Sequence, residues 1–247
     1  MSYFRLKTLI KFNWQFGLAF IILFGIPRFL MVLDANQTRN YNFVSLIFLV
    51  MWITPFIFLT RKGRKFIGII RTKKYTWLVY SFLLGITACT IAYFIGKWLY
   101  QHSISNWFVY ISNSYGAIPI EELKGNNKHL YLVIFALIGM TFSPIGEELL
   151  YRGLIHQSFV SRYGNNKASI IDSLAFTIVH LAHFGIIYVN GTWKFLFIPA
   201  FLWLLLMFLT SRMFFYCKSK SESIYGAILS HAGFNLAMTF FIFYYIL

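Results

Sequence analysis

Apolar residues in this chain form long continuous stretches, separated by short polar segments. The stretches cover residues 13–33, 42–60, 76–99, 129–160, 168–187, 194–215 and 224–247. Most of them come close to the about 20 residues that a helix needs to cross the hydrocarbon core of a bilayer. We therefore expect an all-α, polytopic bundle of transmembrane helices, with residues 1–247 forming one integral membrane domain.

The fourth stretch, residues 129–160, is too long for one straight crossing. Ser is a favoured N-cap and Pro suits the first position of a helix, so Ser143-Pro144 predicts a kink or a fresh helix start. Counted as one net crossing, this stretch gives the bundle about seven crossings, or eight helices if it is divided. The polar segment 101–128 then lies outside the bilayer, with a short interfacial helix around the sequence NWFVYI.

Lysine and arginine are unequally shared between the two sets of loops. With a cytoplasmic N-terminus, the inner segments hold fifteen of these residues and the outer segments hold five. The inner residues are Arg5, Lys7, Lys11, Arg61, Lys62, Arg64, Lys65, Arg71, Lys73, Lys74, Arg162, Lys167, Arg212, Lys218 and Lys220; the outer residues are Arg39, Lys97, Lys124, Lys128 and Lys194. The excess predicts a cytoplasmic N-terminus and an external C-terminus in a cell membrane.

Composition supports the membrane class and argues against others. The chain is 59% hydrophobic and only 12% charged, which leaves too few charges to coat a soluble domain. The net charge is +15, but the basic residues lie in short loops as topology signals and phospholipid contacts, so we expect no nucleic-acid partner. Cys89 and Cys217 have no C-x-x-C partner, and neither is expected in a disulfide or a zinc-thiolate site.

Two adjacent carboxylates, Glu147 and Glu148, stand out in a chain with only seven acidic residues. Ionisable groups at membrane depth are costly, and they usually mark function. Arg152 follows Glu148 by four positions, so the two side chains share one helical face and can pair. Glu147 points about 100° away from Glu148 on a helix and is expected to face elsewhere.

Two further stretches present polar stripes. His180 and His183 are three positions apart, and His231 and Asn235 are four apart, so each pair shares a helical face. Glutamate, histidine and asparagine side chains that converge can activate water and stabilise an oxyanion. For each stripe alone, a structural ion pair or a histidine bonded to a backbone carbonyl is the alternative.

The remaining polar residues in or beside the stretches are given structural roles. Arg28 is interpreted as structural, and Asp172 as a helix cap or packing residue near its helix start. His102, His129 and His156 are expected to be solvated or interfacial. The H-E-x-x-H and G-x-S-x-G motifs of soluble hydrolases are absent from the sequence.

Three motifs in the second half of the chain resemble, in order, those of the CPBP family. This family contains the CAAX proteases and bacteriocin-processing enzymes, also called Abi proteins. The motifs are EELLYR at Glu147 to Arg152, FTIVH at Phe176 to His180, and HAGFN at His231 to Asn235. The resemblance covers residues 130–240 as a catalytic core, whereas the three additional helices within residues 1–100 carry no matching motif.

The resemblance implies an intramembrane endopeptidase on a helical bundle, related to the type II CAAX prenyl protease. Glu147 would activate the attacking water. Glu148 and Arg152 would hold the helix and tune that base. His180 would position the water, or a metal ion if one is bound.

The resemblance further implies that His231 and Asn235 stabilise the tetrahedral oxyanion. His183 is extra to the family pattern. As another imidazole beside Glu147, His180 and His231, it makes a zinc site an open alternative, since catalytic zinc takes three protein ligands and a water.

The expected substrate is a peptide or a membrane-associated precursor, in bacterial peptide pheromone or bacteriocin processing, export or immunity. The basic loops place Glu147 and His231 in the cytoplasmic half, so we expect a cavity open to that side. A second hypothesis is a non-catalytic membrane regulator or scaffold that binds a sensor kinase or a cell-envelope partner. A third is a small-molecule or proton transporter, although no inverted repeat supports it.

Overall fold

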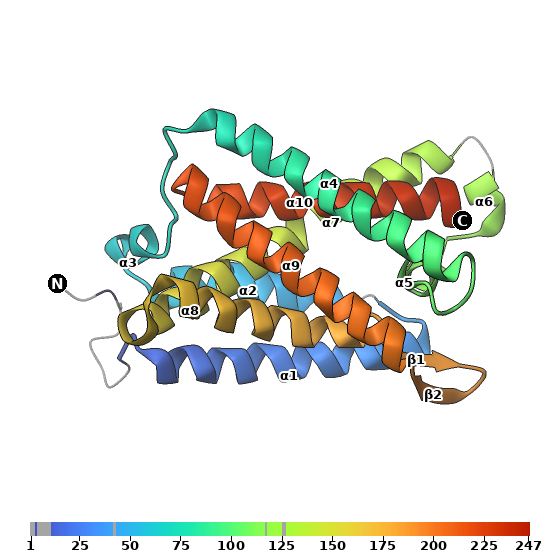
Figure 1. Ribbon diagram of the computed structural model, residues 1–247, viewed down its shortest axis with the longest axis horizontal. Helices are drawn as coiled ribbons and strands as arrows, with labels where there is room; N and C mark the ends of the chain where they lie inside the picture. Colours follow the sequence, from blue (N-terminus) through green and yellow to red (C-terminus); the bar gives the residue numbers. More distant parts are fainter. Residues whose placement is uncertain (1–2, 4–10, 42, 117, 125–126) are drawn as a thin grey trace.

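Long helices that run along one common axis make up the molecule (Figure 1). The computed structural model describes residues 3, 11–41, 43–116, 118–124 and 127–247, so Arg5 and Lys7 of the inner basic set lie outside the described residues. The long helices are α1 (Trp14–Thr38), α2 (Val44–Phe58), α4 (Tyr75–Tyr100), α7 (Lys128–Glu148), α8 (His156–Val179), α9 (Phe197–Ser221) and α10 (Ile224–Phe241). The all-α membrane bundle expected from the sequence is confirmed in its main architecture.

Shorter elements connect these helices. The short α-helices are α3 (Arg61–Phe66), α5 (Trp107–Ile111) and α6 (Ile120–Lys124). Short 3-10 helices follow α5 and α8; these are η1 (Ser112–Tyr115) and η3 (His180–Ala182). The π-helix η2 (Leu149–Ile155) follows α7, and the π-helix η4 (Ile242–Ile246) follows α10. The helix expected around NWFVYI is α5, which is capped by the Asn106 side chain. Its Trp107 and Phe108 are buried in the bundle, so this helix is less exposed than an interfacial helix would be.

Within the described residues, five helical runs are long and apolar enough to cross a membrane, and α2 is a shorter apolar helix. The longest run, Lys128–Ala182, is bent back on itself inside α8. Gly164 has φ 73° and ψ 167° there, a backbone conformation that interrupts the helix and that glycine tolerates. The second part of α8 therefore returns beside η2. The exact number of crossings stays a prediction.

The helix start expected at Ser143-Pro144 is wrong, because α7 continues through Pro144 to Glu148. Proline removes one backbone hydrogen bond, but helices within membrane bundles tolerate it because their neighbours pack around it. Here α2 packs so closely that a Cβ at Gly146 would lie 2.5 Å from the Phe48 carbonyl oxygen. The irregular backbone comes later, in η2, where all seven residues are buried. Wider π-type turns of this kind are frequent at functional sites.

A small β-hairpin was not predicted from the apolar stretches. Strands β1 (Ile186–Val189) and β2 (Thr192–Phe195) pair antiparallel, with Ile187 opposite Lys194. The turn is Asn190-Gly191, and both residues have positive φ, of 52° and 77°. Asn-Gly is a strong hairpin signal, because it suits the two positive φ angles of a tight type I′ turn.

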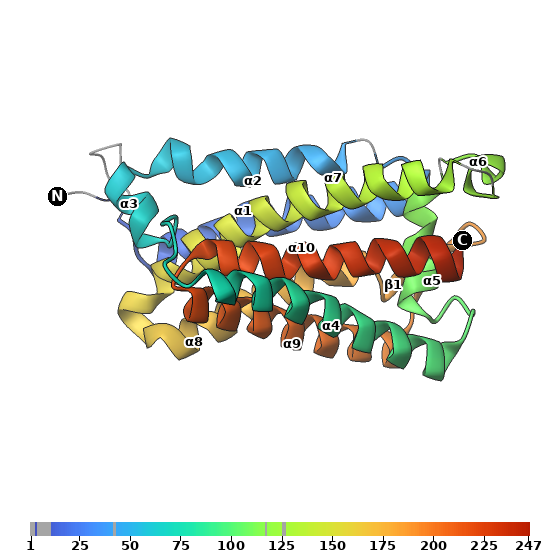
Figure 2. The ribbon, with the colours of Figure 1, turned by 90° about the horizontal axis from the view of Figure 1, so that it is seen from above.

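Helix α10 lies between α7 and α4 when the molecule is viewed from above (Figure 2). Its contact with α4 depends on two glycines. A Cβ at Gly85 of α4 would collide with the Ser230 carbonyl oxygen, and a Cβ at Gly233 of α10 would collide with that of Phe82. Small residues let membrane helices approach closely. This packing fixes the position of His231, the neighbour of Ser230.

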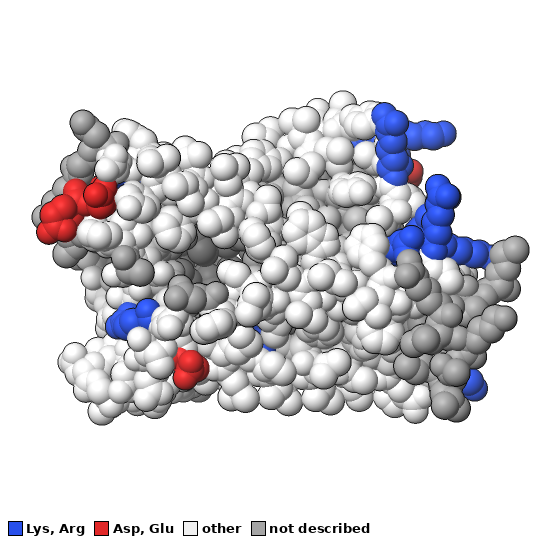
Figure 3. All heavy atoms as spheres, turned by 180° about the vertical axis from the view of Figure 1, so that it is seen from behind, with Lys and Arg blue, Asp and Glu red and all other residues white. Residues whose placement is uncertain are grey.

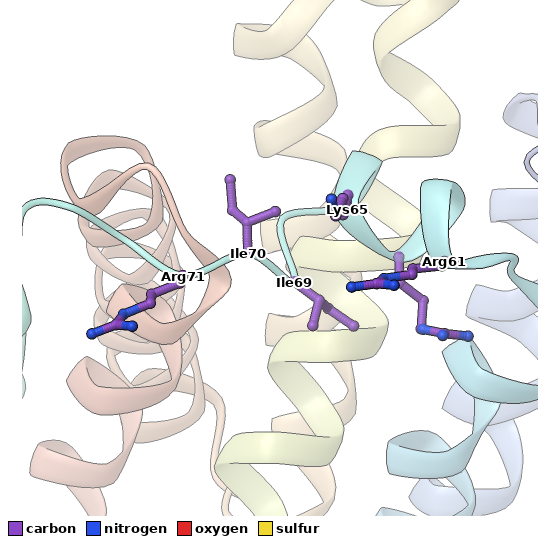
Figure 4. Close-up of a pocket in the computed structure, with 6 residues that line it drawn as sticks. Arg61, Lys65, Ile69, Ile70 and Arg71 are labelled. Carbon is purple, nitrogen blue, oxygen red and sulfur yellow. The ribbon is translucent and has the colours of Figure 1, made fainter.

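Basic side chains gather at one end of the bundle, over α3 and the segment that leads to α4, while acidic side chains lie mainly toward the opposite end (Figure 3). An open pocket of about 500 Å³ at the basic end is lined by Arg61, Arg64, Lys65, Ile69, Ile70 and Arg71 (Figure 4). The separation of charges agrees with the loop asymmetry in the sequence. Which end faces the cytoplasm stays a prediction.

Candidate active site

Polar side chains from segments far apart in the sequence meet inside the bundle. Arg28 comes from α1, Glu147 and Glu148 from the end of α7, Arg152 from η2 and His231 from α10. Their exposed fractions are 2%, 0%, 0%, 0% and 4%. Buried charges are expensive unless they are paired, so this cluster is held by its own internal contacts. None of the six residues lining the basic pocket belongs to it.

The two oxygens of the Glu147 carboxylate have different surroundings. Oε1 forms an ion pair with Arg28 Nη2 at 2.6 Å and accepts a long hydrogen bond from Ser143 Oγ at 3.4 Å. Oε2 is buried and has no hydrogen-bond partner among the described residues. The His231 ring lies across from it, with Nε2 4.0 Å away.

Glu148 approaches the other nitrogen of the His231 ring and has a different ion-pair partner from Glu147. Its Oε1 accepts from Arg152 Nη1 at 3.1 Å, so the ion pair expected from the four-residue spacing is present. The same oxygen accepts from His231 Nδ1 at 2.9 Å. Because Nδ1 is held by Glu148, the Nε2 atom of His231 is directed toward Glu147.

Arg152 is the centre of a second buried network. Its Nη2 donates to the hydroxyl and to the carbonyl oxygen of Ser211 on α9, at 2.5 and 3.2 Å. The guanidinium also lies 4.3 Å from the centre of the Phe176 ring. Asp172 Oδ1 is 3.8 Å from Arg152 Nε. Arg152 therefore ties η2 to α8 and α9 around the site.

The expectation that His156 is solvated or interfacial is wrong. Its ring is buried, Nδ1 donates to Asp172 Oδ2 at 2.8 Å, and Nε2 lies 3.1 Å from Asn165 Oδ1. The physical reason is the reversal at Gly164, which brings the second part of α8 back against η2. Asp172 is thus a packing residue within an ionic network, one of the two roles expected for it.

His180 and His183 meet Arg28. His180 Nδ1 donates to the Phe176 carbonyl oxygen at 2.7 Å, which leaves Nε2 to face Arg28 Nη2 at 3.5 Å. His183 Nε2 lies 3.4 Å from the same Nη2 atom. Trp203 Nε1 donates to the His180 carbonyl oxygen at 3.0 Å and fixes this turn. The two histidines are therefore connected to Glu147 through the arginine.

Asn235 is placed differently from the other motif residues. Its Nδ2 donates to the Gly139 carbonyl oxygen of α7 at 2.8 Å, and its own carbonyl oxygen accepts from Thr239. The bond to Gly139 joins α10 to α7. Among the described residues, neither hydrogen bond of Asn235 reaches the Glu147 carboxylate.

Sequence reasoning missed the involvement of Arg28 in this site. An arginine inside an apolar stretch is itself a signal of function, because a charge at membrane depth needs a partner. Its partner, Glu147, lies on a different helix, so no local spacing could reveal the pair. Tyr151 of η2 was also missed; its side chain is buried beside the charges of Arg28 and Glu147.

The residues named as zinc ligands do not fit a metal ion in this arrangement. Three of their donor atoms, Glu147 Oε1, His180 Nε2 and His183 Nε2, converge on Arg28 Nη2. A guanidinium already occupies the point at which they meet. Among the described residues, no group of three or more His, Cys, Asp or Glu side chains is arranged to hold a metal ion.

Comparison with known proteins finds relatives of part of the chain. Residues 129–237 match the family described as type II CAAX prenyl endopeptidase Rce1-like. An uncharacterized protein of Mycoplasma capricolum subsp. capricolum is 27% identical over 103 residues, which is 40% of this chain and 30% of that protein. The aligned region therefore spans less than a third of that relative. No solved structure matches the chain.

The segment that matches the family contains the site described above apart from Arg28. It runs from the start of α7 into α10 and includes the three motifs that begin at Glu147, Phe176 and His231. Through this segment the chain is a relative of the CAAX proteases of the CPBP family.

Proposed function

We propose that this chain is an intramembrane endopeptidase in which the Glu147 carboxylate activates the water that attacks a peptide bond. The observation that carries the proposal is the position of Glu147 Oε2 beside His231 Nε2, which lies 4.0 Å away. Arg28 holds Oε1 at 2.6 Å, whereas Oε2 is buried without a hydrogen-bond partner among the described residues. Glu148 Oε2 is likewise buried without a hydrogen-bond partner among the described residues. Glu147 is distinguished by its surroundings, because its Oε2 lies 4.0 Å from His231 Nε2, whereas Glu148 Oε1 is held by both Arg152 and His231.

In this mechanism Glu147 Oε2 takes a proton from water as the water oxygen bonds to the carbonyl carbon of the substrate. The carbonyl oxygen becomes an oxyanion in the tetrahedral intermediate. The proton then passes to the leaving nitrogen as the carbon–nitrogen bond breaks. The products are a new carboxylic acid, which keeps the second proton of the water, and a new amine, and Glu147 returns to its starting form. In solution the acid passes that proton on, so the final products are a carboxylate and an ammonium group.

His231 is assigned to the oxyanion. Its Nε2 lies 4.0 Å from Glu147 Oε2, so a group bound beside the base is also within reach of this imidazole. Glu148 fixes the ring by accepting from Nδ1, and Arg152 holds Glu148 in turn. A donor that is oriented before the reaction stabilises developing charge without reorganisation.

The other two motif residues contribute less directly. His180 reaches Glu147 through Arg28, so we assign it to holding the base instead of the water itself. Asn235 donates to the Gly139 carbonyl oxygen, and a role at the oxyanion requires its amide to leave that partner.

We propose a peptide or a membrane-associated precursor as the substrate, because the site is buried in a bundle that lipid surrounds. Processing or export of peptide pheromones and bacteriocins, or immunity to them, in a bacterial cell membrane is the setting that the motif resemblance implies. Attack from the cytoplasmic side follows if the basic end of the bundle faces the cytoplasm.

The experiment uses the purified full-length protein reconstituted in liposomes. One probe is a mixed digest of bacterial membrane proteins. The other is a peptide in which a cysteine is followed by three further residues, and it is used with and without a farnesyl group on that cysteine. Reactions in ¹⁸O-labelled water are read by mass spectrometry. Hydrolysis predicts new carboxyl ends that carry one heavy oxygen, lost in Glu147→Gln and retained in the exposed control Glu121→Gln.

Two results of this experiment change the proposal. Cleavage that persists at the wild-type level in Glu147→Gln, His180→Ala and His231→Ala alike contradicts it, and a wild type that cleaves none of the probes favours the scaffold hypothesis. A parallel reaction with a chelator addresses zinc: we expect unchanged cleavage, because Arg28 occupies the point where the ligands meet. Activity abolished by the chelator and restored by zinc would instead require Arg28 to move.

A further inference from the structure

We propose that Arg28 of α1 is a positioning residue of the active site, which holds Glu147 by Oε1 and so presents Oε2 to the reacting water. This inference rests on the proposed function. It places a residue from outside the matched segment 129–237 at the centre of the reaction.

The contacts of Arg28 are concentrated on one nitrogen. Nη2 lies 2.6 Å from Glu147 Oε1, 3.5 Å from His180 Nε2 and 3.4 Å from His183 Nε2. The guanidinium also lies 5.3 Å from the centre of the Phe48 ring on α2. Arg28 therefore joins its own helix to α2, to the end of α7 and to the turn after α8.

The charges of the site are matched one to one. Arg152 pairs with Glu148 within the same helical segment, at 3.1 Å. Arg28 pairs with Glu147 from another helix, at 2.6 Å. The first pair has further partners, His231 on Glu148 and Ser211 on Arg152. Both carboxylates have an Oε2 atom that is buried without a hydrogen-bond partner among the described residues. The pairs differ in what faces that atom, because Glu147 Oε2 lies 4.0 Å from His231 Nε2.

The two histidines orient the arginine. His180 Nδ1 is committed to the Phe176 carbonyl oxygen, so its Nε2 lone pair is available to the guanidinium. His183 offers its Nε2 atom to the same nitrogen. This gives a role to His183, which the family motifs do not include. Nη2 carries two hydrogens, so one is donated to Glu147 and the two imidazoles share the other, which aims Arg28 at Glu147.

The test compares Arg28→Ala, Arg28→Met and Arg28→Lys with the control Arg39→Asn, an exposed position at the end of the same helix. We expect kcat to fall by about 100-fold in the Ala and Met variants, a loss typical of a catalytic group displaced by about 1 Å. KM should change little, because Arg28 holds the base and not the substrate. The Lys variant should retain part of the activity, and Arg39→Asn all of it.

Chemical rescue separates positioning from folding. Added guanidinium ion at low millimolar concentration should restore part of kcat in Arg28→Ala, where the side chain leaves space. It should not do so in Arg28→Met, where that space is filled. If the Ala and Met variants fail to fold, Arg28→Lys and His183→Ala provide the test instead. We expect both of these variants to have a lowered kcat and unchanged thermal unfolding.

Wild-type kcat in folded Arg28→Met overturns the role of Arg28. The role is also overturned if Arg28→Ala and Arg28→Met are inactive and not rescued by guanidinium while Arg28→Lys and His183→Ala are fully active. The proposed function fails separately: Glu147→Gln remains active in that case, or the wild type cleaves none of the probes. An inactive Glu147→Gln beside an active Arg28→Met leaves the peptidase intact and removes only this inference.

Discussion

Glu148 Oε1 and His231 Nδ1 lie 2.9 Å apart, although the two residues are separated by 83 positions in the sequence. The same oxygen accepts from Arg152 at 3.1 Å. Glu148 thereby locks α10 to the end of α7 and turns the His231 ring toward Glu147. The two adjacent carboxylates thus have different ion-pair partners, Arg152 for Glu148 and Arg28 for Glu147.

A structural role for Glu148 and Arg152 predicts strong coupling between them. Arg152→Met or Glu148→Gln alone leaves a buried charge unpaired, which costs about 3–5 kcal/mol of unfolding free energy. The double variant removes both charges and should recover part of that loss. Thermal and denaturant unfolding in detergent measures the effect. Strictly additive losses would show that the two side chains do not act as a pair.

The two nitrogens of His231 are predicted to have separable roles. Asn places its amide nitrogen near the Nδ1 position and can still donate to Glu148, but it lacks Nε2. His231→Asn should therefore unfold like the wild type while kcat falls by about 100-fold. Gln places its nitrogen near Nε2, so His231→Gln should lose stability more than His231→Asn does. Equal kcat in the wild type and in His231→Asn contradicts the oxyanion role.

Close packing of α4 on α10 is predicted to control the site from a distance. Gly85→Ala forces α4 against the Ser230 carbonyl oxygen, next to His231, and Gly233→Ala forces α10 against that of Phe82. Both changes should lower stability by about 1–3 kcal/mol and reduce kcat.

Gly139→Ala is the matched control for these glycines, since the nearest atom to its added Cβ is 3.9 Å away. Alanine is also the better helix former, so this variant should unfold at or slightly above the wild-type temperature. If Gly85→Ala and Gly139→Ala unfold at the same temperature, the α4–α10 contact is not tight.

Local features of the structure could be predicted from the sequence, whereas contacts between distant helices could not. Hydropathy located the long helices, and the four-residue spacing located the Glu148–Arg152 pair, because both are properties of a single helix. The Arg28–Glu147 pair depends on how α1 packs on α7, which periodicity does not encode. His156 is buried because of the reversal at Gly164, and η2 has no spacing pattern of its own.

The orientation of the bundle can be tested by thiol labelling. Lys73 and Glu121 are exposed and lie in loops expected on opposite sides, and both native cysteines are buried. In intact cells a membrane-impermeant maleimide should label Glu121→Cys and spare Lys73→Cys. Lysed cells should show labelling of both. The reverse pattern in intact cells means that the N-terminus is external.

The central claim is that Glu147 takes a proton from the attacking water. Glu147→Gln tests it most directly, because glutamine keeps the shape and an oxygen for Arg28 but cannot act as a base. The measurement is kcat for a cleaved probe peptide, beside the thermal unfolding of the same preparation. The account predicts that kcat falls by at least about 100-fold, the contribution expected of a general base, in a protein that remains folded. A folded Glu147→Gln variant with wild-type kcat would contradict it.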